Sequence, residues 1–205
     1  MIKFEELDFP VEKIFFTGCT HYGHANICSA TTKWKSGYRD FDSIEQMNTT
    51  IVNGINAKVP SDGLLIHLGD WSFGGSTNVN KFRDELACKV ILLRGNHDHN
   101  VIANNNWIKF ADILHLSVEN FKFVACHYPI IHWHNQSKGA YMLHSHLHGQ
   151  EDSILKEVHN NQRCLDVGLD NYFKIFGSYA PFSISEIESL IPNNSLIDRH
   201  SNEES

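Results

Sequence analysis

The sequence contains no apolar run that approaches the ~20 residues needed for a membrane-spanning helix. Its first residues, MIKFEELDFPVEK, mix charged and apolar side chains and lack the central apolar stretch of a signal peptide. The five cysteines are odd in number and form no CxxC pair, which argues against a disulfide framework and is typical of a reducing compartment. We therefore expect a cytoplasmic protein with no membrane partner.

The chain also lacks an excess of basic residues, because 17 Lys and Arg stand against 24 Asp and Glu, for a net charge of −7. Extended binding to nucleic acid relies on clustered Lys and Arg, so it is not expected, although a local basic pocket stays compatible with this balance. No repeat or linker divides the 205 residues. We expect one domain over residues 1–192, followed by a polar tail over residues 193–205.

Short apolar runs alternate with segments of helical periodicity along the first half of the chain. Three runs are predicted to be buried strands and the two segments between them helices: strands at Lys13–Gly18, Gly63–Gly69 and Lys89–Gly95, and helices at Ser43–Lys58 and Thr77–Ala87. This order predicts an α/β core.

The second half contains further strand signals. We expect a hairpin of Ile113–Val118 with Phe121–Cys126, strands at Tyr141–His148 and Arg163–Gly168, and a helix over Ser183–Ile191. These elements are compatible with the α/β class but do not by themselves give the order of strands in a sheet.

Histidines, acids and one cysteine gather where the predicted strands end. In α/β sheets ligands bind beyond the carboxyl ends of the strands, so these residues are expected to face one pocket. Because residues two apart on a strand point the same way, each of two histidine-containing pairs is expected to offer two donors to one side. Imidazole, carboxylate and amide donors suit Mn, Fe or Zn better than Ca. The segments are Cys19-Thr20-His21, Gly69-Asp70, Gly95-Asn96-His97-Asp98, His127 and His146-Leu147-His148.

The ordered segments C-T-H, G-D, G-N-H-D, H-Y-P and H-S-H-L-H-G resemble the pattern of the calcineurin-like metallophosphoesterases, which is D-x-H, G-D, G-N-H-D/E, H and G-H-x-H. The resemblance runs from about Ile14 to Gly149, with a weaker match over Leu165–Gly168. The stretches THYGHANI, RDFD and HLGDWSFGG look most like small single-domain members from phages and bacteria. The resemblance implies a four-layer α/β sandwich of two mixed β-sheets flanked by helices, and the host cytoplasm as location if the gene belongs to a phage.

The resemblance also implies two divalent metal ions and a role for each matching residue. His97 would act as general acid beside the scissile phosphate, and Asp98 would orient His97 through a hydrogen bond. A hydroxide that bridges the metals would attack the phosphorus. The implied ligands are Cys19, His21 and His148 for the first ion, Asp70 as a bridge, and Asn96, His127 and His146 for the second ion.

Two positions depart from the family pattern. Cys19 stands where the family has Asp; a thiolate carries the same charge and binds zinc and iron well, but it cannot chelate through two oxygens. Cys19 is therefore either a true ligand, or a small buried residue beside a weakly held first ion. Ser145 replaces the usual glycine before His146. Asn96 also has a second interpretation, as an ordinary turn residue after glycine.

Three residues are candidates for substrate binding. Arg39 and Arg94 can hold a phosphate, or can be solvated charges or members of ion pairs. His24 either faces the pocket or caps the next segment.

The leading hypothesis is a metal-dependent phosphoesterase that hydrolyses phosphodiester or phosphomonoester bonds of a small, nucleotide-like molecule. A DNA or RNA nuclease on the same fold is the second hypothesis, and the net charge counts against it. A metal-poor scaffold protein is the third, and Cys19 is the only feature that favours it. The sequence makes no prediction of oligomeric state.

Overall fold

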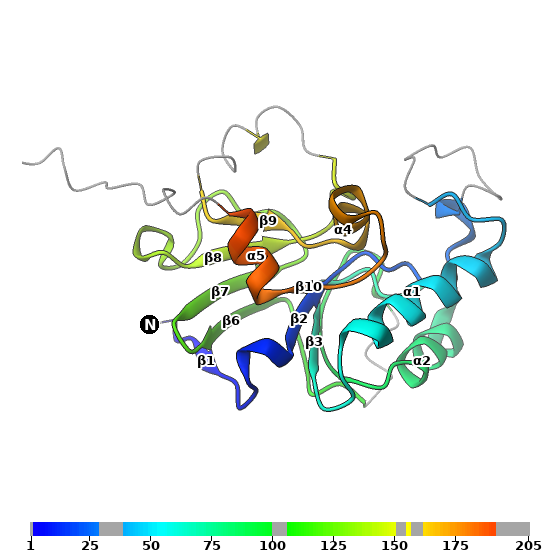
Figure 1. Cartoon of the computed structure of the whole chain (residues 1–205), viewed down its shortest axis with the longest axis horizontal. Helices are drawn as coiled ribbons and strands as arrows, with labels where there is room; N and C mark the ends of the chain where they lie inside the picture. Colours follow the sequence, from blue (N-terminus) through cyan, green and yellow to red (C-terminus); the bar gives the residue numbers. More distant parts are fainter. Residues whose placement is uncertain (1, 29–38, 100–105, 151–154, 157–161, 192–205) are drawn as a thin grey trace, which may run out of the picture.

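Two five-stranded sheets form the framework of the protein, whose structure is a computed structural model describing residues 2–28, 39–99, 106–150, 155–156 and 162–191 (Figure 1). The predicted tail over residues 193–205 lies outside the described residues. Within the described part, no helix combines the length and the apolar character required to cross a bilayer. None of the five cysteines forms a disulfide, and all five are buried.

The first sheet has the strand order β10-β2-β3-β4-β5. Strands β2 to β5 are parallel, and β10 pairs antiparallel with β2 at the edge. The predictions of strands at β2, β3 and β4 are confirmed; β2 and β3 are shorter than the predicted run at both ends, and β4 is shorter at its C-terminal end. The bounds are Ile14–Thr17 for β2, Leu64–His67 for β3, Lys89–Leu93 for β4, Lys109–Ala111 for β5 and Phe182–Ser183 for β10.

The second sheet has the order β1-β6-β7-β8-β9. Its centre is the predicted hairpin of β6 and β7, closed at the pair Val118 and Phe121, with Glu119 at a φ of 49° in the turn. The neighbouring pairs are parallel. The bounds are Glu5–Glu6 for β1, Ile113–Val118 for β6, Phe121–Cys126 for β7, Tyr141–His144 for β8 and Cys164–Asp166 for β9.

Polar side chains begin two of the helices. Ser43 accepts a hydrogen bond from the backbone N–H of Gln46, and Ser183 forms a full capping box with Glu186, so both predicted starts are confirmed. The helix after β9 was not predicted. The described helices are α1 (Ile44–Lys58), α2 (Gly75–Glu85), α4 (Leu169–Phe176) and α5 (Ile184–Leu190), with short 3-10 turns η1 (Val11–Lys13), η2 (Ala25–Ile27) and η4 (Gln136–Lys138).

The side chains of β2 point alternately to the two faces of the first sheet, which explains why the protein has two separate cores. Ile14 and Phe16 point into the core between the two sheets, whereas Phe15 belongs to the core between the first sheet and helices α1 and α2. Burying an aliphatic or aromatic side chain contributes about 1.5–3 kcal/mol, so these two cores hold the sandwich together. A smaller cluster around Trp133 covers the outer face of the second sheet. The structure thus has the predicted α/β sandwich of two mixed sheets with flanking helices.

Candidate metal centre

The site loops do not have the strand geometry that the sequence pattern predicted. Strand β2 ends at Thr17 and β8 ends at His144, so the two histidine-containing pairs lie in the loops beyond them. The prediction that strand alternation aligns these pairs is therefore wrong. The left-handed backbone conformation directs them instead, and it is costly for residues with a Cβ and tends to concentrate at functional sites. The φ values are 52° for Cys19, 49° for His21, 56° for Asp70, 68° for His146 and 53° for His148.

Backbone hydrogen bonds bring the loops of the first sheet into contact. The N–H of Cys19 donates to the carbonyl of Gly69 at 2.9 Å, and the N–H of His21 donates to the carbonyl of Asp70 at 3.0 Å. Gly95 packs against the same loop, where an added Cβ would lie 2.3 Å from the backbone nitrogen of Asp70. Only glycine permits this approach, so the third loop reaches the centre because it has no side chain there.

The first donor group comprises Cys19, His21 and His148, whose ligand atoms all lie within 4.8 Å of one another. The imidazoles of His21 and His148 stack with their centroids 5.1 Å apart. Both ring nitrogens of His21 are buried without a hydrogen-bond partner among the described residues. Burial, together with the neighbouring His148, holds the pKa of His21 well below its usual value. A neutral, unsatisfied imidazole of this kind suits a metal cation.

The second donor group surrounds His127. Its Nδ1 lies 2.8 Å from the carbonyl oxygen of Leu68, an acceptor only, so Nδ1 carries the proton and Nε2 keeps its lone pair. That Nε2 faces the Asn96 Oδ1 at 2.9 Å and the Asp70 Oδ2 at 3.5 Å. The Nδ1 of His146 lies 3.1 Å away from it. Several acceptor atoms therefore point at one another. A cation between them would bind all of their lone pairs, whereas hydrogen bonds among them would not satisfy all of these atoms.

Cys19 belongs to both donor groups, because its sulfur also lies within 4.8 Å of the ligand atoms of Asp70 and His127. The side chain is buried and its Sγ accepts a hydrogen bond from the backbone N–H of His146 at 3.1 Å. Burial raises the pKa of the Cys19 thiol well above its usual value, and the Asp70 carboxylate adds to the effect. A bound cation reverses this balance, because coordination deprotonates a thiol.

Arg39 is not placed to bind substrate; it is a member of an ion pair, which is the second of its two predicted roles. The side chain is only 1% exposed, and its Nε donates to the Asp170 Oδ1 at 2.5 Å. Its guanidinium also donates to the backbone carbonyls of Cys19 at 2.6 Å and Thr20 at 3.3 Å. Arg39 therefore holds the first loop in place from behind, and no face of it reaches the centre.

Asp170 is a functional residue that the sequence analysis missed. Its Oδ2 lies 2.5 Å from the Nδ1 of His148, which directs the other ring nitrogen of His148 toward the first donor group. Asp170 is fully buried in the first turn of α4. The one available signal was its place two residues after Gly168, where the weaker family match ends.

Asp98 does not have the predicted role of orienting His97. One carboxylate oxygen accepts hydrogen bonds from the backbone N–H groups of Asp70 at 2.8 Å and Gly95 at 2.7 Å, and the other accepts from Trp71 at 2.9 Å. Burial raises the pKa of Asp98, although these three hydrogen bonds oppose that shift. The carboxylate therefore fixes the two loops that carry Asp70 and Asn96.

His97 lies at the open side of the centre. Its backbone N–H donates to the Asp70 Oδ1 at 2.9 Å, and its ring is exposed beside Phe73 at 4.9 Å and His21 at 5.6 Å between centroids. His24 stacks on Phe73 at 3.5 Å and lies 5.3 Å from His21. Burial and the neighbouring His97 lower the pKa of His24 to about 4. His24 thus lies beside the centre, and it is also the N-cap residue of η2, although its side chain makes no capping hydrogen bond.

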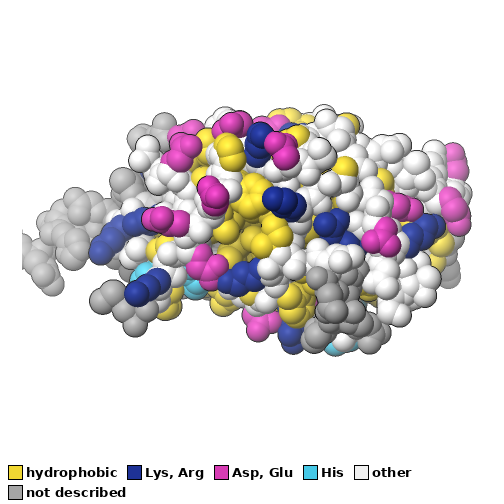
Figure 2. Space-filling model, turned by 90° about the horizontal axis from the view of Figure 1, so that it is seen from below, with side chains coloured by type: hydrophobic (Ala, Val, Ile, Leu, Met, Phe, Trp, Pro, Cys, Tyr) yellow, Lys and Arg dark blue, Asp and Glu magenta, His cyan; other side chains and the backbone are white. Residues whose placement is uncertain are grey.

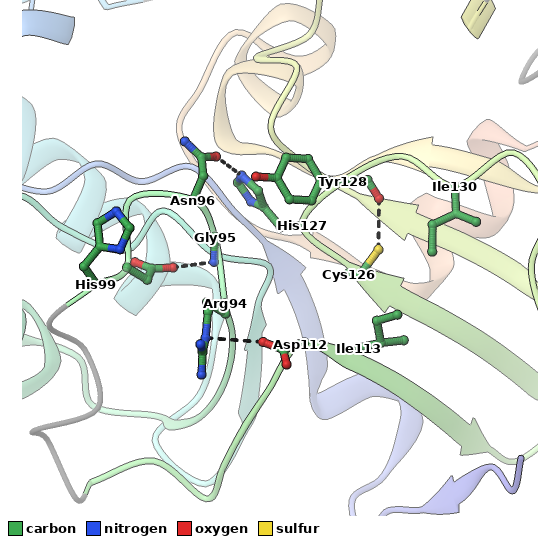
Figure 3. Close-up of a pocket in the computed structure, with 11 residues that line it drawn as sticks. Arg94, Gly95, Asn96, His99, Asp112, Ile113, Cys126, His127, Tyr128 and Ile130 are labelled. Atoms are coloured by element: carbon green, nitrogen blue, oxygen red, sulfur yellow. Dashed lines mark hydrogen bonds and ion pairs between the residues drawn. The ribbon is translucent and has the colours of Figure 1, made fainter.

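A cavity of about 670 Å³ opens beside the second donor group, with Asn96 and His127 in its lining. Figure 3 shows both residues at one end of the cavity, with Arg94 and Asp112 forming an ion pair on another wall. Arg94 therefore lines the same cavity as two candidate ligands, and its side chain is half-exposed at 48%, whereas Arg39 is buried. The arrangement provides a metal-ligand cluster next to a space for an organic group.

These features define a class of protein: an α/β sandwich with candidate metal ligands gathered at the carboxyl ends of its strands. The family model for calcineurin-like phosphoesterases matches residues 12–188, and the chain belongs to this family. The predicted resemblance is thereby confirmed, and the chain is a phosphoesterase in the general sense. Its substrate, mechanism and metals are not fixed by that membership.

Individual relatives are distant in sequence. The chain is 24% identical over 190 residues to the uncharacterized protein MJ1445 of Methanocaldococcus jannaschii, covering 91% of this chain and 96% of that one. Among solved structures, a protein of unknown function from Aquifex aeolicus, AQ665, is similar with a TM-score of 0.63 and 18% identity, over 87% of this chain and 98% of that chain. This similarity shows a shared fold over nearly the whole length. The nuclease MPE of Pseudomonas putida matches 67% of this chain and 61% of its own at 19% identity, with a TM-score of 0.42.

Proposed function

We propose that the chain is a dinuclear phosphoesterase, in which Cys19, His21 and His148 hold one divalent cation and Asn96, His127 and His146 hold another. Asp70 would contribute a ligand to both, since its Oδ2 lies 3.5 Å from both the His21 Nε2 and the His127 Nε2. The observation that carries the proposal is the convergence of lone pairs on one point, described above for the His127 Nε2. When bound, such ions supply a strong nucleophile from water at neutral pH and neutralise charge on a phosphoryl group.

His97 acts on the leaving group in this proposal. Its ring is exposed beside the donor groups, and the backbone N–H donates to Asp70, so the ring position is tied to the bridging carboxylate. A protonated imidazole there can give its proton to the ester oxygen as the P–O bond breaks, and is left neutral. His24, stacked against the same Phe73 ring, lines the approach and contributes to substrate binding.

A small nucleotide-like ester is the substrate class that we propose. The net charge of −7 disfavours a long nucleic-acid track. Figure 2 shows one face of the molecule on which Lys and Arg side chains alternate with Asp and Glu around a central apolar area, so this face offers no basic stripe. A pocket beside the ions suits a compact ester better than a polymer.

Metal removal followed by reloading tests the proposal. Protein stripped with a chelator should not hydrolyse bis(4-nitrophenyl) phosphate, and reloading with Mn, Fe or Zn should restore turnover. The Asp70→Asn variant should bind fewer than two ions and lose activity, because it removes the shared ligand. Fully loaded protein that hydrolyses neither aryl monoesters nor aryl diesters would overturn the proposal. Processive, salt-sensitive cleavage of oligonucleotides would show a nuclease instead.

A further inference from the structure

The cavity beside Asn96 and His127 is larger than a phosphate group requires. Its volume of about 670 Å³ falls in the range of pockets that enclose whole small molecules, about 300–1,000 Å³. Figure 3 shows that it extends from the two ligand residues across to Ile113 and Ile130, on the side away from His99. The cavity therefore has room for an organic group attached to a phosphate held at the centre.

Apolar side chains line one wall of this cavity. Ile113 at the start of β6 is 46% exposed, and Tyr128 just after β7 is 50% exposed. The Tyr128 ring packs edge-on against His127 at 5.0 Å and His146 at 4.8 Å, so this wall begins directly at the second donor group. Apolar side chains exposed together beside a reactive centre are typical of a ligand surface.

Two charged residues also line the cavity and pair with each other, and Figure 3 shows one of them, Asp112, beside Ile113. The Arg94 Nε lies 3.3 Å from the Asp112 Oδ1, and the Arg94 guanidinium lies over the Phe110 ring at 5.0 Å. A guanidinium already paired with a carboxylate has less attraction for a second phosphate than a free one. The pair still presents N–H donors of the guanidinium and a free carboxylate oxygen as acceptor, which suits the polar edge of a neutral heterocycle or the hydroxyls of a sugar.

We infer that this cavity is the subsite for the nucleoside part of the substrate, with the base against Ile113 and Tyr128 and its polar edge toward Arg94 and Asp112. The inference rests on the proposed function, because it places the phosphate at the ion-binding residues. It changes the predicted role of Arg94 from a phosphate ligand to a contact for the nucleoside. The enzyme then selects nucleotide esters by the group that enters the cavity, not by the phosphate.

Two esters with the same leaving group test the subsite. Thymidine 5′-(4-nitrophenyl phosphate) and methyl 4-nitrophenyl phosphate break the same bond and differ only in the group that would enter the cavity. We expect kcat/KM to be about 10- to 100-fold higher for the thymidine ester, mainly through KM, since contacts to one base contribute about that much. Equal kcat/KM for the two esters would overturn the inference while leaving the phosphoesterase proposal intact.

The Ile113→Gln variant and its control Ile175→Gln locate the effect. Ile175 on α4 is similarly exposed, at 41%, and is not among the residues that line the cavity. We expect Ile113→Gln to lower kcat/KM for the thymidine ester about fivefold and to leave the methyl ester unchanged, because a polar amide weakens the apolar wall. Ile175→Gln should change neither. An equal loss on both esters, or the same loss in both variants, would contradict the assignment.

Calorimetry with thymidine 5′-monophosphate gives a result that does not depend on turnover. Binding to the wild-type protein that weakens in Ile113→Gln and not in Ile175→Gln supports the subsite even if neither ester is hydrolysed, an outcome that would overturn only the proposed reaction. Absence of binding to the wild-type protein, or equal binding to all three proteins, would reject the subsite itself.

Discussion

The Nδ1 of His148 lies 2.5 Å from the Oδ2 of Asp170, and the other oxygen of this fully buried carboxylate accepts from Arg39 at 2.5 Å. Burial opposes ionisation of Asp170, but the Arg39 charge and the hydrogen bond from His148 outweigh it and hold the pKa of Asp170 below its usual value. Because Arg39 also binds the carbonyl of Cys19, one carboxylate positions two of the proposed ligands of the first ion.

Replacing Asp170 should therefore weaken metal binding from behind the site. In Asp170→Asn we expect the first ion to bind about 10–100-fold more weakly, the usual effect of losing a carboxylate that orients a ligating histidine. We also expect a loss of about 3–5 kcal/mol in the free energy of unfolding, because Arg39 is left buried without its counter-charge. Metal titration calorimetry and urea denaturation measure the two effects. The exposed Asp84→Asn on α2 is the control, and equal behaviour of the two variants would contradict this role.

His97→Ala should separate catalysis from metal binding. We expect kcat to fall about 10²–10⁴-fold, the range for loss of one general acid, with the metal content unchanged. A substrate whose leaving group needs no proton, such as a 4-nitrophenyl ester, should be affected less than an alkyl ester. Elemental analysis and steady-state kinetics on both esters test this. Unchanged turnover of the alkyl ester with full metal loading would refute the role.

The Cys19→Asp variant should change the metal preference of the site. An Asp restores the usual family residue and replaces a soft thiolate by hard oxygens, so we expect a shift in relative affinity from Zn toward Mn. Competition between the two metals, read by elemental analysis, measures the shift. Cys88→Ala is the matched control, because Cys88 is also a buried thiol and packs between the first sheet and its helices. Identical metal profiles for wild type and Cys19→Asp would count against Cys19 as a ligand.

Buried His67 should make the protein less stable in mild acid. Its Nε2 lies 2.9 Å from the Thr20 hydroxyl, and burial lowers the pKa of His67 from 6.5 to about 3. In the unfolded chain His67 therefore binds a proton below about pH 6.5, whereas in the folded protein it stays neutral until the pH falls to about 3. The stabilisation is complete above pH 6.5 and is lost as the pH falls through that window, at up to about 1.4 kcal/mol per pH unit.

The His67→Gln variant tests this, since glutamine can still pair with the hydroxyl and cannot titrate. Urea denaturation between pH 7 and pH 4 should show a shallower decline of the free energy of unfolding in the variant than in the wild type. Parallel pH profiles would show that His67 is not the source of the acid sensitivity.

Much of the fold could be predicted from the sequence, because the sequence signals for its strands and helices are local. The apolar run before Gly18 predicted β2, and the Ser183 and Glu186 pair predicted the start of α5, since capping depends on neighbours three residues apart. Helix α4 was missed because it follows directly on a short strand, without a capping side chain at Gly168. Sheet order was not predictable, because it depends on pairing between segments far apart in the chain.

The sequence by itself determined which chemical groups meet at the centre, because the order and spacing of the Cys, His, Asp and Asn segments specify the family. Only the tertiary structure decided how they are held there. Arg39 became a buried support and not a substrate contact because Asp170 lies 131 positions away along the chain and adjacent in space. Asp98 likewise holds two loops together, because the backbone N–H groups of Asp70 and Trp71, distant in the sequence, lie next to its carboxylate. Charge and hydrogen-bond partners are set by three-dimensional proximity, which residue spacing does not record.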